Sequence, residues 1–261
     1  MSYYPILSAP FCNGKTTLYN FPPNSWESVD KCDQVVSLTF SKDGFWHSKA
    51  IEKLKYQEYK IFNYSDIAKL TPDGALPLLS LSKEGLPEIS PELPVINFNH
   101  TITPAHRATL SLQSKFSETS YQGEIDAFPP QGSMLSFSPF MQIDNNIKNY
   151  FLILNLEKRA GNREVEVKIY DANSKNLKKV QSAFSNQISI ISLDGIGFDE
   201  TSLPVIICRD MAFIPLYFSC FKKGELLSLE HTHPPASLVI HGNRFGVQKQ
   251  LKDYWFSQLK N

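Results

Sequence analysis

Short apolar runs and strict alternation dominate the second half of the chain. In residues 164–170 (EVEVKIY), charged and apolar residues alternate, so the two valines and the isoleucine would share one buried face. Residues 150–157 (YFLILNLE) form a continuous apolar run. The polar segment 159–163 between them contains Ala-Gly-Asn, which is typical of a turn. We therefore predict that the two runs form a β-hairpin.

Further short strands follow at the spacing expected of a β-sandwich or barrel. They are predicted at residues 108–114, 133–140, 187–193, 203–208, 213–221, 225–231 and 237–241. The predicted fold class is therefore all-β and mainly antiparallel. Its body would be a β-sandwich or jelly roll from about residue 105 to 245.

Helical periodicity is rare. Apolar residues recur at helical spacing near the end of the chain, at Val247, Leu251, Tyr254, Trp255 and Leu259. They would form one stripe, so we predict a C-terminal α-helix. Residues 48–60 would form a second helix, with Ser48 as its N-cap.

Proline placement divides the chain. Residues 72–104 contain six prolines, whereas residues 140–203 contain none. Because proline cannot donate to a sheet ladder, the first stretch is predicted to be an extended connector. We predict an irregular N-terminal portion at 1–104, with a short helix and this Pro-rich connector. The sandwich and its C-terminal helix would occupy 105–261.

One segment has the motifs of a known type of module. Asn155-Leu156 is followed by the alternating strand Val165-Glu166-Val167, by Tyr170 and by the turn 171–173 (DAN). This order resembles bacterial immunoglobulin-like or fibronectin-III-like β-sandwich modules, in which such a turn often continues with glycine where Ser174 stands. The resemblance covers residues 150–220 and concerns the fold alone. It implies no activity, because sites and not folds carry function.

Charge and composition narrow the function classes. Twenty-six basic and 26 acidic residues give a formal net charge of zero, so we expect neither a nucleic-acid partner nor a membrane partner. The first 15 residues lack the basic and apolar regions of a secretory signal, which predicts a soluble cytoplasmic protein. The cysteines, at positions 12, 32, 208 and 220, have no zinc or redox spacing, and reduced thiols are expected.

The histidines near the C-terminus form the sharpest candidate site. His231 and His233 would point to the same face of a strand, and His241 could join them if the chain folds back after Pro234-Pro235. The His-x-His pair is similar to that of the cupin motif, although the carboxylate expected after the pair is missing. These residues predict a site for a single divalent transition metal. The alternatives are structural histidines that hold a turn, or a metal-free site.

A second candidate site contains carboxylates beside a polar aromatic step. Tyr121, Gln122, Glu124 and Asp126 are predicted to bind a ligand, since carboxylate and amide groups can hydrogen-bond sugar hydroxyls. The simpler interpretation is a polar loop between two strands.

The chain lacks a G-x-S-x-G nucleophile elbow, a dinucleotide fingerprint and a complete phosphate loop. We therefore rank first a non-enzymatic binding or accessory protein for a small ligand or carbohydrate. The alternatives are a metal-dependent enzyme that uses the histidine site, and an oligomeric structural protein that pairs edge strands.

Overall fold

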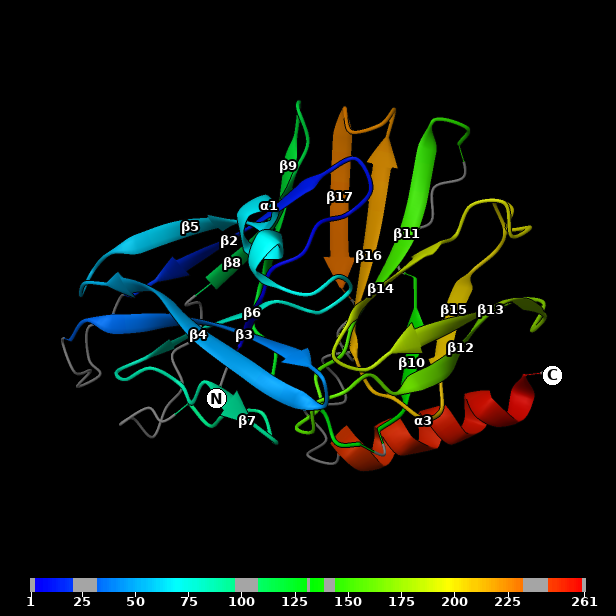
Figure 1. Cartoon of the computed structure of the whole chain (residues 1–261). Helices are drawn as coiled ribbons and strands as arrows, with labels where there is room; N and C mark the ends of the chain where they lie inside the picture. The colour runs from blue at the N-terminus through cyan, green and yellow to red at the C-terminus, as the bar shows by residue number, and fades with distance from the viewer. Residues whose placement is uncertain are drawn as a thin grey trace.

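The computed structural model describes residues 3–20, 32–96, 108–130, 132–138, 144–231 and 244–259. Antiparallel strands make up most of this part of the chain, and they form four small sheets (Figure 1). The sheets are arranged as the four blades of a β-propeller.

The first half of the chain builds two sheets. One has the order β1-β6-β3-β4-β7 and the other β5-β2-β8-β9. The strands of the first are β1 (Tyr4–Pro5), β3 (Gln34–Lys42), β4 (Phe45–Leu54), β6 (Leu78–Ser82) and β7 (Ile89–Ser90). Those of the second are β2 (Asn13–Tyr19), β5 (Tyr59–Asn63), β8 (Ala108–Gln113) and β9 (Glu118–Gln122).

The second half builds the other two sheets, with the orders β10-β15-β12-β13 and β14-β11-β16-β17. The strands of the former are β10 (Met134–Phe137), β12 (Glu164–Asp171), β13 (Leu177–Phe184) and β15 (Pro204–Cys208). Those of the latter are β11 (Ile147–Leu154), β14 (Ile188–Ser192), β16 (Ile214–Phe221) and β17 (Leu226–His231).

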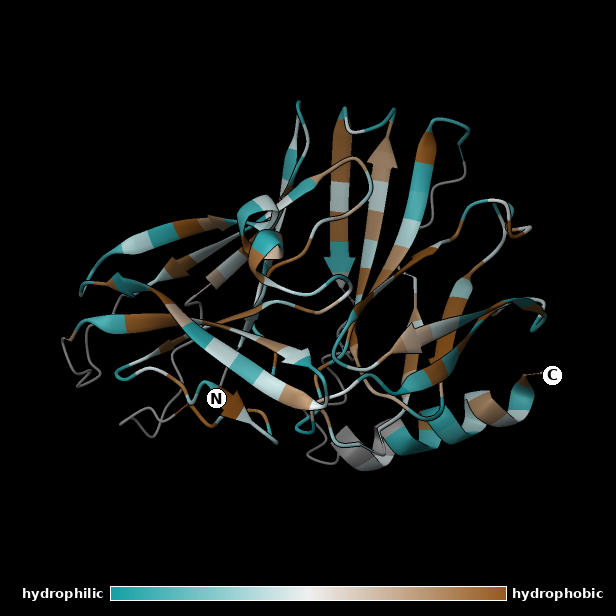
Figure 2. Cartoon of the chain, viewed as in Figure 1, coloured by the Kyte–Doolittle hydropathy of each residue, from teal (hydrophilic) through white to brown (hydrophobic). Residues whose placement is uncertain are grey.

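The helical elements are few. A short α1 (Tyr64–Ile67) and the 3-10 turn η1 (Ala68–Leu70) follow β5, and α3 (Arg244–Gln258) lies near the end of the chain. The predicted C-terminal helix is therefore present. Trp255 and Phe256 of α3 pack against the outer face of β12 and β15, while most of the helix surface is hydrophilic (Figure 2). Among the described residues, no helix combines the length and the apolar character needed to cross a bilayer.

Several strands are buried on both faces. In β11, Phe151 and Ile153 belong to the core shared with β12 and β15, while Leu152 and Leu154 point into a second core shared with β6, β8 and β16. A third core lies between the two sheets of the first half and draws on β2, β3, β5, β6 and β8. Two-sided burial explains why residues 150–154 form a continuous apolar run.

The predicted sandwich or jelly-roll body is therefore wrong, and so is the immunoglobulin-like interpretation of residues 150–220. The chain is mostly antiparallel β, but it forms four small blades instead of two large facing sheets. Short, evenly spaced strands are common to both architectures, and the alternation within a strand does not say how many sheets cover it. The prediction of an irregular N-terminal portion is also wrong, because β1–β7 build one sheet and contribute to a second.

Two local predictions also differ from the structure. Residues 48–60 are not a helix: they continue β4, which pairs with β3, and then begin β5. The runs at 150–157 and 164–170 are strands β11 and β12, but they do not form a hairpin. β11 pairs with β14 and β16, whereas β12 pairs with β13 and β15 in a different sheet. The division near residue 104 stays a prediction.

Candidate functional site

A polar pocket of about 390 Å³ lies where four connecting segments meet. Its lining is drawn from the β3–β4 turn, the turn before β6, the segment before β12 and the turn between β13 and β14. The lining residues are Ser41, Lys42, Asp43, Gly44, Pro72, Asp73, Ala75, Gly161, Asn162, Asn186 and Gln187. The volume falls in the range of small-molecule sites.

Tight turns shape the rim of the pocket. β3 and β4 pair through Lys42 and Phe45, so Asp43 and Gly44 alone form the loop. Both have positive φ, 50° and 78°, which is the geometry of a type I′ hairpin turn. On the opposite rim, Pro72-Asp73-Gly74 makes a second turn in which glycine takes a φ of 78°. Both turns place an aspartate at the pocket.

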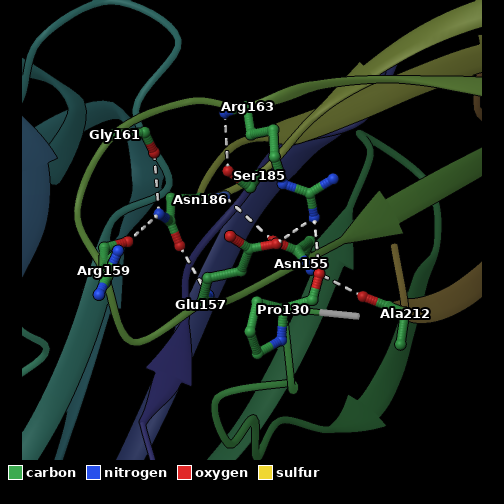
Figure 3. A network of polar contacts seen from close by, with 9 residues as sticks. All are labelled: Pro130, Asn155, Glu157, Arg159, Gly161, Arg163, Ser185, Asn186 and Ala212. Carbon is green, nitrogen blue, oxygen red and sulfur yellow. Dashed lines mark hydrogen bonds and ion pairs between the residues drawn. The ribbon is translucent and has the colours of Figure 1, made fainter. Parts of the chain in front are cut away.

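The floor of the pocket is held by Asn186, whose side chain is buried (Figure 3). Its amide nitrogen donates hydrogen bonds to the carbonyl oxygens of Arg159 (2.9 Å) and Gly161 (2.8 Å). Its amide oxygen accepts a hydrogen bond from the backbone N–H of Glu157 at 2.8 Å. Asn186 takes a φ of 57°, a conformation that asparagine tolerates better than most residues.

The same residue links the two halves of the chain. The backbone N–H of Leu76 donates to the Asn186 carbonyl at 3.2 Å, and Ala75 forms a β-bridge with Gln187. The Ser41 hydroxyl oxygen accepts a hydrogen bond from the backbone N–H of Gly161 at 2.8 Å. Because these bonds join loops that are distant in sequence, the pocket is largely preformed.

An ion pair adjoins the hydrogen bonds of Asn186 (Figure 3). A guanidinium nitrogen of Arg163 lies 2.6 Å from a carboxylate oxygen of Glu157, which is 9% exposed. The backbone N–H of Arg163 donates to the Ser185 hydroxyl at 2.8 Å, directly before Asn186. Asn155, fully buried, donates to the carbonyl oxygen of Ala212 at 2.7 Å. The carbonyl and amide groups below the pocket therefore have fixed partners.

The lining favours a hydrogen-bonded ligand. Two carboxylates, one ammonium group and the side-chain amides of Asn162 and Gln187 surround the space. None of the described residues that line the pocket is aromatic. Sequence reasoning missed this site. The Asp43-Gly44 and Pro72-Asp73-Gly74 turn signals are visible in the sequence. That the two turns lie at one pocket depends on the tertiary structure, which these signals do not encode.

The predicted ligand residues lie elsewhere. Tyr121 and Gln122 end β9, and neither these residues nor Glu124 and Asp126 line the pocket. Tyr121 is partly buried against the core that β11 shares with β6, β8 and β16. Burial, together with the nearby Glu124 carboxylate, raises the pKa of Tyr121. Gln122 and Asp126 are exposed. The structure thus brings Tyr121 close to Glu124, and ligand binding there stays a prediction.

The predicted metal histidines fall largely outside the described part of the chain. His233 and His241 lie within 232–243, and of His231 only its place at the end of β17 is described. Within the described ranges, no three His, Cys, Asp or Glu side chains are grouped so that they could hold a metal ion. This finding concerns the described ranges alone, so the metal site predicted at His231, His233 and His241 stays a prediction.

Comparison with known proteins adds no assignment. No family model matches the chain, and neither the curated proteins nor the solved structures include a significant match.

Proposed function

We propose that the protein is a non-enzymatic binding or accessory protein that recognises a small polyhydroxylated ligand, such as a saccharide, in the polar pocket. The observation that carries this proposal is the meeting of Asp43, Asp73, Asn162 and Gln187 around one preformed space. Carboxylates accept hydrogen bonds from hydroxyl groups, and amides both donate and accept. This combination matches the alternating donors and acceptors of a sugar.

Preorganisation supports the same proposal. Hydrogen bonds from Asn186 and to Ser41 fix the Gly161 segment, so little loop ordering is left to oppose binding. The polar lining that the described residues form favours a small, strongly hydrated ligand.

The test is calorimetric titration of the full chain with a panel of neutral mono- and disaccharides. We expect at least one to bind, and Asp73→Ala or Gln187→Ala to weaken its binding about tenfold, which corresponds to one lost hydrogen bond to a polar or charged group. Asp66→Ala is the matched control, because Asp66 is an exposed aspartate on α1 outside the pocket.

A variant at the site predicted from the sequence, at Tyr121, Gln122, Glu124 and Asp126, distinguishes ligand binding there from binding in the pocket. Gln122→Ala should leave binding unchanged if the ligand occupies the pocket. A loss of binding in Gln122→Ala, with Asp73→Ala unaffected, would instead place the ligand at β9. Absence of binding across the panel would overturn the proposed ligand class.

We also propose a cytoplasmic location. All four cysteines are free, and three of them are buried. Burial raises the pKa of the Cys208 and Cys220 thiols, which keeps them in the unreactive protonated form. Both observations suit a reducing compartment.

A further inference from the structure

Three turns meet at one end of the molecule, away from the polar pocket. They are the turn at residues 9–12, the β8–β9 turn at 114–117 and the β16–β17 turn at 222–225 (Figure 1). The Ser114 and Ser117 hydroxyls both donate hydrogen bonds to the carbonyl oxygen of Gly224. A Cβ atom at Gly224 would lie 2.9 Å from the Cβ of Ser114 and 3.6 Å from the carbonyl oxygen of Phe11. The three turns are therefore packed against one another.

Large apolar side chains project from all three turns. Phe11 is 48% exposed, Phe116 is 66% exposed, and Leu226, the first residue of β17, is 65% exposed. Turn tips are normally polar, and isolated exposed apolar residues need no explanation. Here three of them lie on turns that pack against one another, and exposed apolar surface gathered in one region marks an interaction site.

The backbone at Phe11 is held in a costly conformation. The backbone N–H of Cys12 donates to the carbonyl oxygen of Ala9 at 3.0 Å, which closes a turn with Pro10 in its second position. Phe11 takes a φ of 66° in the third position, where a type II turn ordinarily has glycine or asparagine. A bulky residue in this conformation is an outlier. The backbone geometry therefore does not account for a phenylalanine at this position.

Lysines surround the apolar residues. Lys115, Lys222 and Lys223 are exposed at the same turns. The Lys115 ammonium lies 5.2 Å from the centre of the Phe116 ring, and that of Lys222 lies 5.0 Å from the Phe221 ring. Glu225, 4.0 Å from Lys222, is the acidic residue within these turns, and the adjacent Glu118 is paired with Lys15 at 2.8 Å. The three lysines therefore give the turns a net positive charge. We call these residues the tip surface: Phe11, Lys115, Phe116, Lys222, Lys223 and Leu226.

We propose that the tip surface docks onto an anionic lipid bilayer. The apolar side chains would enter the boundary between headgroups and acyl chains, and the ammonium groups would face the anionic headgroups. Stable attachment to a bilayer needs two signals, and the tip surface supplies both an apolar and a basic one. Positive charge around the apolar residues is the complement that an anionic membrane requires.

This inference departs from the expectation that the protein has no membrane partner. That expectation rests on a net charge of zero, which is a sum over the whole chain. A sum does not reveal three lysines gathered at adjacent turns. The proposal is also independent of the polar pocket, since no residue of the tip surface lines it.

The test is co-sedimentation of the full chain with phosphatidylcholine vesicles, with and without phosphatidylserine. We expect the protein to pellet with the anionic vesicles and to be released by salt. Phe11→Asn with Phe116→Ser should weaken binding by about tenfold or more for each ring removed. Asparagine is chosen at position 11 because it tolerates the positive φ. Lys115→Glu with Lys223→Glu should weaken binding by about fivefold or more for each charge reversed.

Matched controls lie at the other end of β2. Tyr59 and Ile61 are 61% and 45% exposed on β5, where Tyr59 pairs with Tyr19, so Tyr59→Ser with Ile61→Ser removes equivalent apolar surface. Lys49→Glu with Lys55→Glu reverses two exposed lysines elsewhere on the molecule. Both controls should bind anionic vesicles as the parent does, and circular dichroism melts should show that all variants are folded.

Three results would overturn the proposal. The first is failure to pellet with either vesicle. The second is equal pelleting of folded tip variants and the parent. The third is the absence of vesicle binding together with a dimer that Phe116→Ser dissociates, which would make the tip surface a contact between copies of the chain.

Discussion

The side-chain amide of Asn186 lies 2.8 Å from the carbonyl oxygen of Gly161, and this hydrogen bond joins the floor of the pocket to its rim. The two residues belong to different turns, one between β13 and β14 and the other before β12. A single buried amide thus sets the position of a pocket wall.

Replacing Asn186 should destabilise the fold strongly. Asn186→Ala removes three side-chain hydrogen bonds and leaves two carbonyl groups and one N–H group without these partners. We expect a loss of about 3–5 kcal/mol in the free energy of unfolding, measured by urea denaturation. Asn186→Gly should lose about 1 kcal/mol less, because glycine accepts the φ of 57° without strain. Asn162→Ala, an exposed rim residue, is the control, and an Asn186→Ala variant as stable as that control would contradict the assigned role.

Asp171 should make stability depend on pH. Burial opposes the charge of its carboxylate, but hydrogen bonds from Ser174, Leu203 and Asn173 outweigh burial and lower its pKa. A lowered folded-state pKa gives stability that is present above the unfolded value of about 3.9 and lost as pH falls through the folded value. Urea denaturation at neutral and acidic pH should therefore show that Asp171→Asn destabilises strongly at pH 7 and progressively less towards low pH. An equal loss of unfolding free energy in Asp171→Asn at both pH values would contradict a stabilising role of the charged Asp171 carboxylate.

The adjacent aromatic residues of α3 should differ in their effects. Trp255 packs edge-on against Phe137 of β10, with ring centres 5.0 Å apart, whereas Tyr254 is 56% exposed. We expect Trp255→Ala to lower the free energy of unfolding by about 2–3 kcal/mol, through lost burial of apolar surface. Tyr254→Ala should change it by less than about 0.5 kcal/mol. Similar effects of the two substitutions would show that α3 does not pack on this face in solution.

Thiol reactivity should follow burial. Cys32 is partly exposed, whereas Cys12, Cys208 and Cys220 are buried. Burial, with a smaller contribution from the nearby Cys220, raises the pKa of Cys12 to about 11. Alkylation near pH 8 followed by mass spectrometry should modify Cys32 first and the other three only in denaturant. Early modification of Cys208 would be inconsistent with its place in the core between β11 and β15.

The sequence predicted most strand positions after residue 105. The runs at 108–114, 133–140, 187–193, 203–208, 213–221 and 225–231 correspond to β8, β10 and β14–β17. The run predicted at 237–241 lies outside the described residues. The alternation in 164–170 also predicted correctly that Val165, Val167 and Ile169 are buried. These signals succeed because side chains alternate between the two faces of a strand, so the local order of apolar and polar residues shows which face is buried.

Pairing and packing could not be predicted in the same way. Residues 48–60 have a charge pattern compatible with a helix, but their pairing with β3 makes 48–54 a strand, with Trp46 buried just before them. Tertiary context routinely overrides such weak helical preference. Similarly, polar residues 159–163 suit a hairpin turn, yet they connect strands of two different sheets. The carbonyl oxygens of Arg159 and Gly161 accept hydrogen bonds from the Asn186 amide there.

The candidate pocket was missed for the same reason. Asp43 and Asp73 each lie in a turn that the local sequence predicts. Their convergence with Asn162 and Gln187 depends on how the blades are arranged, which no local pattern encodes.

The most direct test of the central claim is an amide NMR titration of the full chain with the saccharide that binds best in calorimetry. If the pocket is the binding site, the largest shift changes should fall on Lys42, Asp73, Asn162 and Gln187, and Asn186→Gly should abolish them. Shifts confined to residues 118–126, or none at saturating ligand, would contradict the account.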